Sequence, residues 1–178
     1  MCFSKVNLCF MVLNSAQMRK LIETEKLVYD YLDLEKQLQP ASFDLTVAKV
    51  FRIVSKGAVD FDNSQRVISK TEEIPFDSDG WADLAPGIYK VQYAEAVKIP
   101  ADLVGVTFCR SSLSRCGIDL YNGYWDPGYE GRGESMLIVH NSNGAKLKKR
   151  AKVAQIAFFE LGEATTHLYA GMHHKENL

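Results

Sequence analysis

Cysteine and histidine are scarce in this sequence, and so are the spacings that would join them into a metal site. The 178 residues include four cysteines and four histidines, and no two cysteines stand in a CxxC spacing. A structural zinc site needs about four such ligands in a recognisable pattern, so the sequence argues against zinc. Reduced thiols in a cytoplasmic protein are the expectation.

An excess of charge of either sign is also missing. Lysine and arginine number 21 and aspartate and glutamate number 22, which leaves a formal net charge of -1. Without a bulk positive field the chain lacks the electrostatic footprint of a nucleic-acid-binding protein, so we expect no nucleic-acid partner. Any anion site must come from local clustering of basic residues.

Long apolar runs, internal repeats and low-complexity tracts are absent as well. The first ten residues, MCFSKVNLCF, contain polar side chains and lead into no small-residue cleavage site, so we expect neither a signal peptide nor a membrane span. We expect residues 1–10 to be a dispensable N-terminal extension, residues 11–162 to form one domain and residues 163–178 to form a tail. One hydrophobic core suffices for a chain of this length.

What is present is a series of short strand patterns behind one helix. Asn14, with Gln17 three residues later, resembles a capping box, so a short amphipathic helix should open the domain. Residues 42–53 alternate in polarity, which predicts a strand with one buried face. The Asp44 carboxylate would lie on the other face, free for partners. Turn signals across residues 57–87 suit a meander.

Further short strands are predicted in the second half of the chain. They cover residues 88–93, 96–99, 104–108, 136–139 and 153–159. Residues 27–38 have no clean period and should be a loop or a short strand. Many short strands with one N-terminal helix predict an all-β barrel or sandwich.

A local basic run follows the turn at residues 141–144. It comprises Lys146, Lys148, Lys149, Arg150 and Lys152. We interpret it as a solvated hairpin edge whose lysines prevent edge-to-edge pairing of strands. RNA binding is the alternative, but no interleaved aromatic residues support it.

Residues 108–133, FCRSSLSRCGIDLYNGYWDPGYEGRG, concentrate the polar groups that could do chemistry. Their first part places two fixed cations beside small hydroxyls, which suits a polyphosphate better than a single carboxylate. These side chains are Arg110, Ser111, Ser112 and Arg115. By itself, however, an Arg-Ser-Ser segment is most often a solvated turn.

The second part of this stretch combines a turn with a carboxylate. Asn122-Gly123 is a tight-turn signal and predicts a hairpin whose arms lie near Gly117 and Trp125. Asp126 opens a Pro-Gly turn, with the Tyr129 ring three residues on. An aspartate at this place commonly caps its own turn, so the carboxylate becomes a catalytic candidate through its combination with the basic segment.

Gln155 stands out in the strand predicted at residues 153–159, which is otherwise apolar on both faces. A buried amide must be hydrogen-bonded, so this side chain is either structural or a ligand contact.

Taken together, these motifs resemble the dUTPase and dCTP deaminase superfamily, most nearly the archaeal-type dUTP diphosphatases of its deaminase-like branch. RSSLSRCGI is similar to the family's phosphate-binding motif, and GYWDPGYEGRGE to the motif that carries the catalytic aspartate. QPASFDLTV and KVAQIAFFEL resemble two further motifs. The resemblance implies a distorted jelly roll (a β-clip, dUTPase-like fold) that assembles as a homotrimer, with active sites at the subunit interfaces.

The resemblance also implies a role for each candidate residue. Asp126 would activate water, and Tyr129 would pack against the deoxyribose and exclude a 2′-hydroxyl. Backbone groups near residues 121–123, with the Asn122 amide, would read the pyrimidine. The phosphates would be bound by Arg110, Ser111, Ser112, Arg115 and Gln155. Mg2+ would travel on the triphosphate with Asp44 in its outer shell through water, and the tail would act as a lid.

The expected function is therefore hydrolysis of dUTP to dUMP and pyrophosphate. A dCTP deaminase, or an enzyme that performs both steps, is the alternative, and a non-catalytic nucleotide-binding trimer is a third possibility. Related deaminases place a glutamate three residues before an asparagine, where this chain has Ile138, which can carry no proton. Glu134 would lie roughly 13 Å away along a regular strand, too far to substitute unless the strand bulges. We expect Glu134 to be structural, or to form a turn with Arg132.

Overall fold

The computed structural model describes residues 11–178, so the predicted extension over residues 1–10 lies outside the described residues. Three helices are present: α1 (Ser15–Glu25), α2 (Leu34–Gln37) and α3 (Ser111–Arg115). The strands are β1 (Val28–Tyr29), β2 (Leu38–Gln39), β3 (Ser42–Ile53), β4 (Thr71–Ile74), β5 (Trp81–Leu84), β6 (Gly87–Tyr93), β7 (Ala96–Lys98), β8 (Leu103–Cys109), β9 (Ile118–Tyr121), β10 (Tyr124–Trp125), β11 (Glu130–Gly131), β12 (Glu134–Val139), β13 (Ala145–Lys148) and β14 (Lys152–Glu160).

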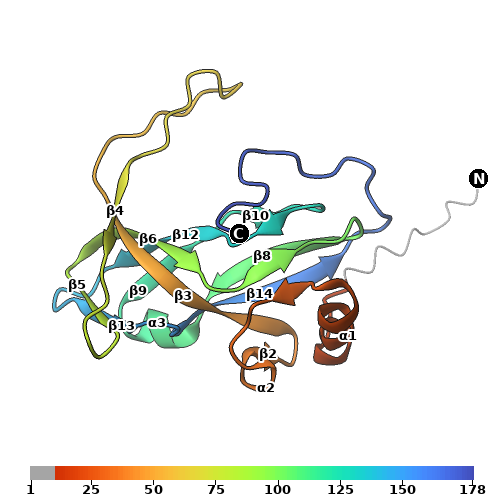
Figure 1. Cartoon of the computed structure of the whole chain (residues 1–178), viewed down its shortest axis with the longest axis horizontal. Coiled ribbons are helices and arrows are strands. Elements are labelled where there is room, and N and C mark those ends of the chain that lie inside the picture. The colour runs from red at the N-terminus through yellow and green to blue at the C-terminus, as the bar shows by residue number, and fades with distance from the viewer. Residues whose placement is uncertain (1–10) are drawn as a thin grey trace, which may run out of the picture.

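The strands pair antiparallel in three sheets, which confirms the predicted all-β class (Figure 1). The largest sheet has nine strands. Its main path runs β10-β8-β14-β3-β6-β12-β9, and β2 and β4 add to β3 off this path. A three-stranded sheet, β1-β7-β11, and a two-stranded sheet, β13-β5, complete the domain. The predicted strands at residues 88–93, 96–99, 104–108, 136–139 and 153–159 correspond to β6, β7, β8, β12 and β14.

The long strand β3 runs through the centre of this arrangement. Its first half pairs with β14 and its second half with β6 and β4. Five consecutive residues, Phe43 to Val47, are buried, so the prediction of a single buried face is wrong for this half. Gln37 of α2 covers the polar face by donating to the Asp44 carbonyl, and Glu95, between β6 and β7, accepts from Thr46.

The N-terminal helix begins as the sequence predicts. The Asn14 side chain accepts from the Gln17 amide at 3.0 Å, and the Gln17 side chain accepts from the Asn14 amide at 3.0 Å, which completes the capping box. Met18 and Ile22 fix the helix to the core, since both are buried. Within residues 27–38 the expected short strand is β1, but α2 was not predicted, although Asp33 caps it.

The predicted hairpin at Asn122-Gly123 is wrong. β9 pairs with β12 and β10 pairs with β8, so the two arms lie at opposite ends of the sheet path. A two-residue link favours a hairpin when its arms have no better partners, but here Leu120 and Trp125 are each buried against other strands. Similarly, β13 pairs with β5 rather than with β14, so the predicted hairpin edge in the basic run is also wrong.

Two segments extend beyond the sheets. Residues 54–70, between β3 and β4, form an arm that projects from the body and is bridged between Ala58 and Val67 (Figure 1). Residues 163–178 run back over the domain next to β10. None of the helices formed by residues 11–178 has the length and apolarity needed to cross a bilayer.

Candidate active site

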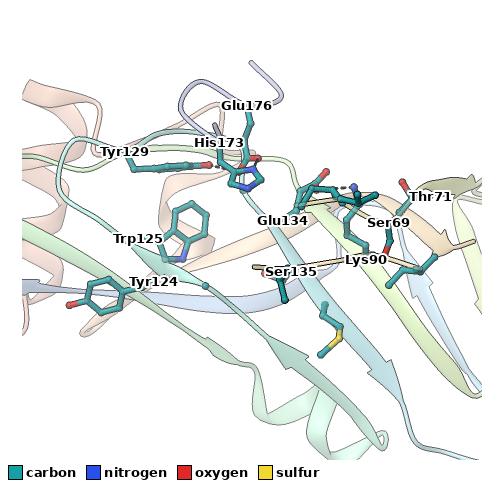
Figure 2. Close-up of a pocket in the computed structure, with 18 of the residues that line it drawn as sticks. Ser69, Thr71, Lys90, Tyr124, Trp125, Tyr129, Glu134, Ser135, His173 and Glu176 are labelled. Carbon is teal, nitrogen blue, oxygen red and sulfur yellow. Dashed lines mark hydrogen bonds and ion pairs between the residues drawn. The ribbon is translucent and has the colours of Figure 1, made fainter. Parts of the chain in front are cut away.

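A cleft of about 600 Å³ lies where the base of the arm, the β10 to β12 region and the C-terminal tail meet (Figure 2). Its lining includes Trp125, Asp126 and Tyr129, which belong to residues 108–133, and Glu134 directly after them. The arm contributes apolar residues, among them Val67 and Ile68, and the tail contributes Tyr169, His173 and Glu176. Asp126, the predicted catalytic base, and Tyr129, the predicted sugar-packing residue, therefore line the same cleft.

The turn after β10 presents Asp126 to this cleft. The Tyr129 amide donates to the Asp126 carbonyl at 3.1 Å, and Gly128 adopts φ +85°, a left-handed conformation that favours glycine. A Cβ atom at Gly128 would come within 2.7 Å of the Leu168 Cβ. Glycine is required at this position both for the turn and for the close approach of the tail.

Tyr129 lies under the tail. Its ring meets the rings of Trp125 and Tyr169 edge-on, with centroids 5.2 Å and 5.7 Å away. Its hydroxyl donates to Glu176 Oε1 at 3.0 Å, a contact visible in Figure 2. Burial, followed by the neighbouring Glu176 carboxylate, raises the pKa of Tyr129, so the hydroxyl stays protonated and remains a donor.

The side chain of Asn122 is engaged within the fold beside the cleft. Its Oδ1 accepts from the Tyr93 hydroxyl at 2.6 Å and from the Ser135 hydroxyl. Its Nδ2 donates to the Thr107 carbonyl at 3.3 Å. The amide that the sequence proposed as a base reader therefore fixes the β9–β10 link, which leaves the adjoining backbone to face a ligand.

Glu134 is held by an ion pair. Its carboxylate lies 2.8 Å from Lys90 Nζ, a contact drawn in Figure 2, rather than in a turn with Arg132. β12 pairs with β6 in continuous register from Glu134 to Val139, so no bulge carries Glu134 toward Ile138. Glu134 is structural here, as expected, and its partner is Lys90.

A second cluster of polar residues lies where β8 ends. Leu113 is buried and anchors α3, a helix that was not predicted, whereas Ser111 and Ser112 are exposed. Arg110 precedes the helix, and its Nε lies 3.5 Å from Asp44 Oδ1. Burial raises the pKa of the adjoining Cys109 thiol, which makes it a poor thiolate nucleophile.

The prediction that the Asp44 carboxylate is free is wrong, because Asp44 has 0% exposure. Its Oδ2 lies 3.1 Å from Lys152 Nζ and accepts from Gln39 Nε2 at 3.2 Å. A carboxylate in the interior needs such partners.

The basic run is therefore not uniformly solvated. Lys152 faces Asp44, and Arg150 Nη1 lies 3.8 Å from Oε1 of the fully buried Glu95. Sequence reasoning missed Lys152, Arg150 and Glu95. A buried acid in an apolar segment signals that a cation must be near, but the pattern alone does not identify which distant cation it is.

Gln155 lies next to Asp44 on the neighbouring strand. Its Cα pairs with that of Asp44 across the β14–β3 ladder, and it is half-buried. Among the described residues, its Nε2 makes one long hydrogen bond, of 3.5 Å to Ser42 Oγ. The amide therefore retains hydrogen-bonding capacity toward a ligand.

The acidic residues of the site do not form a metal cage. Residues 11–178 contain no group of three or more His, Cys, Asp or Glu side chains arranged to hold an ion. The Asp44 carboxylate is already paired with cations. The residues present suit an ion that arrives bound to phosphates and do not suit one held by the chain itself.

The catalytic candidate and the phosphate cluster are well separated within one chain. Trp125, which precedes Asp126, pairs with Gly105, and Arg110 lies five residues further along the same segment. An extended strand of that length spans roughly 17 Å between its terminal Cα atoms. One chain therefore brings Asp126 and Tyr129 together, and it brings Arg110 and Gln155 together, but it does not join the two sets.

Comparison with known proteins identifies relatives of this chain. Residues 12–161 match the family model described as dCTP deaminase-like. The probable deoxyuridine 5′-triphosphate nucleotidohydrolase of Methanosarcina barkeri is 44% identical over 167 residues, which cover 93% of this chain and 98% of that protein. The deoxyuridine 5′-triphosphate nucleotidohydrolase of Methanocaldococcus jannaschii is 41% identical over 139 residues, 77% of this chain and 86% of that protein.

A solved structure supports the same fold. The 2′-deoxycytidine 5′-triphosphate deaminase from Agrobacterium tumefaciens superposes with a TM-score of 0.67 at 23% identity, covering 85% of this chain and 48% of that chain. At this identity the match concerns the fold alone. With a family model that covers most of the chain and relatives above 40% identity, the chain belongs to the dCTP deaminase-like family.

Proposed function

We propose that the protein is a dUTP diphosphatase, which hydrolyses dUTP to dUMP and pyrophosphate. The observation that carries this proposal is the placement of Asp126 beside Tyr129 in a cleft whose other acids are engaged, Glu134 by Lys90 and Glu176 by Tyr129 and His173. One carboxylate is then available to activate water. The names of relatives that match nearly the full chain support the same substrate.

In the proposed reaction a water molecule attacks the α-phosphorus while the Asp126 carboxylate accepts its proton. The bond from phosphorus to the bridging oxygen breaks, and pyrophosphate leaves. Arg110, Arg115 and Gln155 stabilise the charge that develops on the phosphate oxygens. The substrate is taken to be the magnesium complex of dUTP, in which the ion neutralises part of the phosphate charge.

We further propose a homotrimer whose sites are shared between subunits. Since Asp126 and Arg110 of one chain lie too far apart for one triphosphate, a second copy would supply the phosphate cluster. Backbone groups at Asn122-Gly123 would read the pyrimidine, and Tyr129 would pack against the sugar. The tail would close over the nucleotide.

Deamination of dCTP is the alternative, and it requires a group that shuttles protons at the pyrimidine. Ile138 cannot do so, and Glu134 is tied to Lys90 on a regular strand. The purified protein should therefore release pyrophosphate from dUTP and no ammonia from dCTP.

Assaying both products with both nucleotides tests the proposal. Ammonia release from dCTP comparable to pyrophosphate release from dUTP would establish the deaminase alternative. Nucleotide binding without either product would indicate a non-catalytic trimer.

A further inference from the structure

Two cations from different parts of the chain share one buried carboxylate beside the predicted phosphate residues. Lys152 Nζ lies 3.1 Å from Asp44 Oδ2, and Arg110 Nε lies 3.5 Å from Asp44 Oδ1. The Lys152 and Arg110 side chains are 30% and 28% exposed, whereas Asp44 is fully buried. The carboxylate therefore holds both cations from beneath while part of each still faces outward.

The backbone fixes this arrangement. The Arg110 amide donates to the Val153 carbonyl at 3.2 Å, so the start of the phosphate motif lies directly beside the start of β14. On the same strand, Gln155 pairs with Asp44. Lys152 thus lies among the residues already expected to bind phosphate, and it opens the KVAQIAFFEL motif that contains Gln155.

We propose that Lys152 is a further phosphate ligand and that Asp44 positions Lys152 and Arg110 as a pair. This inference rests on the proposed function, because it deepens the description of the triphosphate site. Arg110 and Lys152 contribute two positive charges and Asp44 one negative charge, so these three side chains together have a net charge of +1. A polyphosphate is the ligand that suits such a cluster.

The contact geometry supports this division of roles. Arg110 faces Asp44 through Nε, so its two terminal nitrogens remain for a bidentate contact with phosphate. Oδ1 of Asp44 is buried and makes no hydrogen bond within the described residues, so its interaction with Arg110 is an ion pair of loose geometry. Lys152 also donates to the Lys36 carbonyl, so a purely structural role is the alternative that a test must separate.

Lys152→Met in the full chain tests the ligand role, with inorganic triphosphate as the probe in calorimetry. We expect binding to weaken roughly 10- to 100-fold, the loss of one charge-assisted hydrogen bond to a phosphate. Lys152→Arg, which keeps the charge, should retain most of the affinity. Lys146→Met is the matched control, since Lys146 belongs to the same basic run but lies on exposed β13 near Asp83, and it should bind as the wild type does.

Asp44→Asn separates positioning from a metal role. A positioning role predicts a higher KM for dUTP with an unchanged dependence on magnesium concentration. A requirement for more magnesium in this variant would overturn the positioning assignment and favour the outer-shell role.

Wild-type affinity of Lys152→Met for triphosphate would overturn the ligand role. If Lys152→Met does not fold, wild-type affinity of Lys152→Gln, whose amide keeps polar contact without charge, would overturn it equally. A wild-type protein that fails to hydrolyse dUTP but binds triphosphate through Lys152 would contradict the proposed function and leave this inference standing.

Discussion

At the scale of single residues, the site depends on side chains that hold other groups in place. Asn122 is the example nearest the cleft, because Tyr93, Ser135 and Thr107 use its donors and acceptors. The sequence predicts a hairpin turn and a base-reading amide at Asn122, whereas the structure engages this side chain within the fold. The sequence could not give the role, because the three partners come from β6, β12 and β8, which are distant along the chain.

Asn122→Ala should lower the free energy of unfolding by about 1 to 3 kcal/mol, because the Tyr93 and Ser135 hydroxyls can then bond only to each other and one of them is left without an acceptor. Urea denaturation measures the change. Gln65→Ala on the exposed arm is the control and should stay within about 0.5 kcal/mol of the wild type. Equal stability of the two variants would mean that the hydrogen bonds around Asn122 contribute nothing net.

Asp126→Asn should reduce kcat for dUTP by roughly 10²- to 10⁴-fold while nucleotide binding is retained, since the amide keeps the shape and cannot accept the proton. Steady-state assays and calorimetry with a non-hydrolysable analogue measure the two quantities. Asp83→Asn, on exposed β5, is the control and should be fully active. Wild-type turnover in Asp126→Asn would remove the base role.

At the scale of elements, the C-terminal tail is hydrogen-bonded to the turn that bears Asp126. The Tyr169 amide donates to the Pro127 carbonyl at 2.8 Å, and the Lys175 amide donates to the Glu130 carbonyl at 2.6 Å. Glu176 accepts from the Tyr129 hydroxyl. The segment that bears Asp126 and the tail that covers it are therefore one hydrogen-bonded unit.

Glu176→Ala should loosen this unit without affecting the sheets. Loss of the Tyr129 and His173 contacts is expected to speed amide hydrogen exchange at Tyr169 and Lys175 by about 10-fold, whereas β14 amides should keep their rates. Mass spectrometry of exchanged peptides reports both regions. Unchanged exchange in the tail would show that the backbone bonds alone hold it.

In the small sheet β1-β7-β11, ionisation of Tyr29 is expected to lower the stability of the protein at alkaline pH. Burial, followed by the hydrogen bond to Glu130, raises the pKa of Tyr29 to about 12. Because the folded pKa exceeds the unfolded value of about 10, this stabilisation is complete below pH 10 and is lost as the pH rises toward 12. Tyr129 and Tyr93 shift in the same direction.

Tyr29→Phe should therefore flatten the fall in stability between pH 10 and 12 by about 1 to 2 kcal/mol, allowing for the partial exposure of Tyr29. Chemical denaturation at several pH values measures the slope. An identical slope in the variant would mean that Tyr29 ionises equally in the folded and unfolded chain.

The positions of single strands could be predicted from the sequence, but their pairing could not. Short apolar segments between turn signals located β6, β8 and β12, because those signals are local. Strand pairing is not local. The sequence therefore predicts a hairpin at the Asn122-Gly123 link and a solvated Lys152, and the structure shows neither. α3 has five residues, too few to show a helical period.

At the scale of the whole molecule, one chain would provide two half-sites in the proposed trimer. The Asp126 half forms the cleft with the arm and tail, and the Arg110 half forms the cation cluster around Asp44. The residues of both halves are those that the family resemblance predicts. Their separation of roughly 17 Å along β8 could not be predicted from the sequence, since it depends on the pairing of Trp125 with Gly105.

Subunit complementation tests the central claim, that Asp126 of one chain and Arg110 of another act on the same dUTP. Asp126→Asn and Arg110→Gln, each inactive alone, are co-expressed with different tags, and mixed assemblies are purified through both tags. Purification through both tags leaves only trimers that contain both variants, and in each of these one interface in three pairs an intact Asp126 with an intact Arg110, so about a third of the shared sites should be complete. The account predicts about that fraction of wild-type dUTP hydrolysis in the mixture, whereas activity no higher than the sum of the two single variants would contradict it.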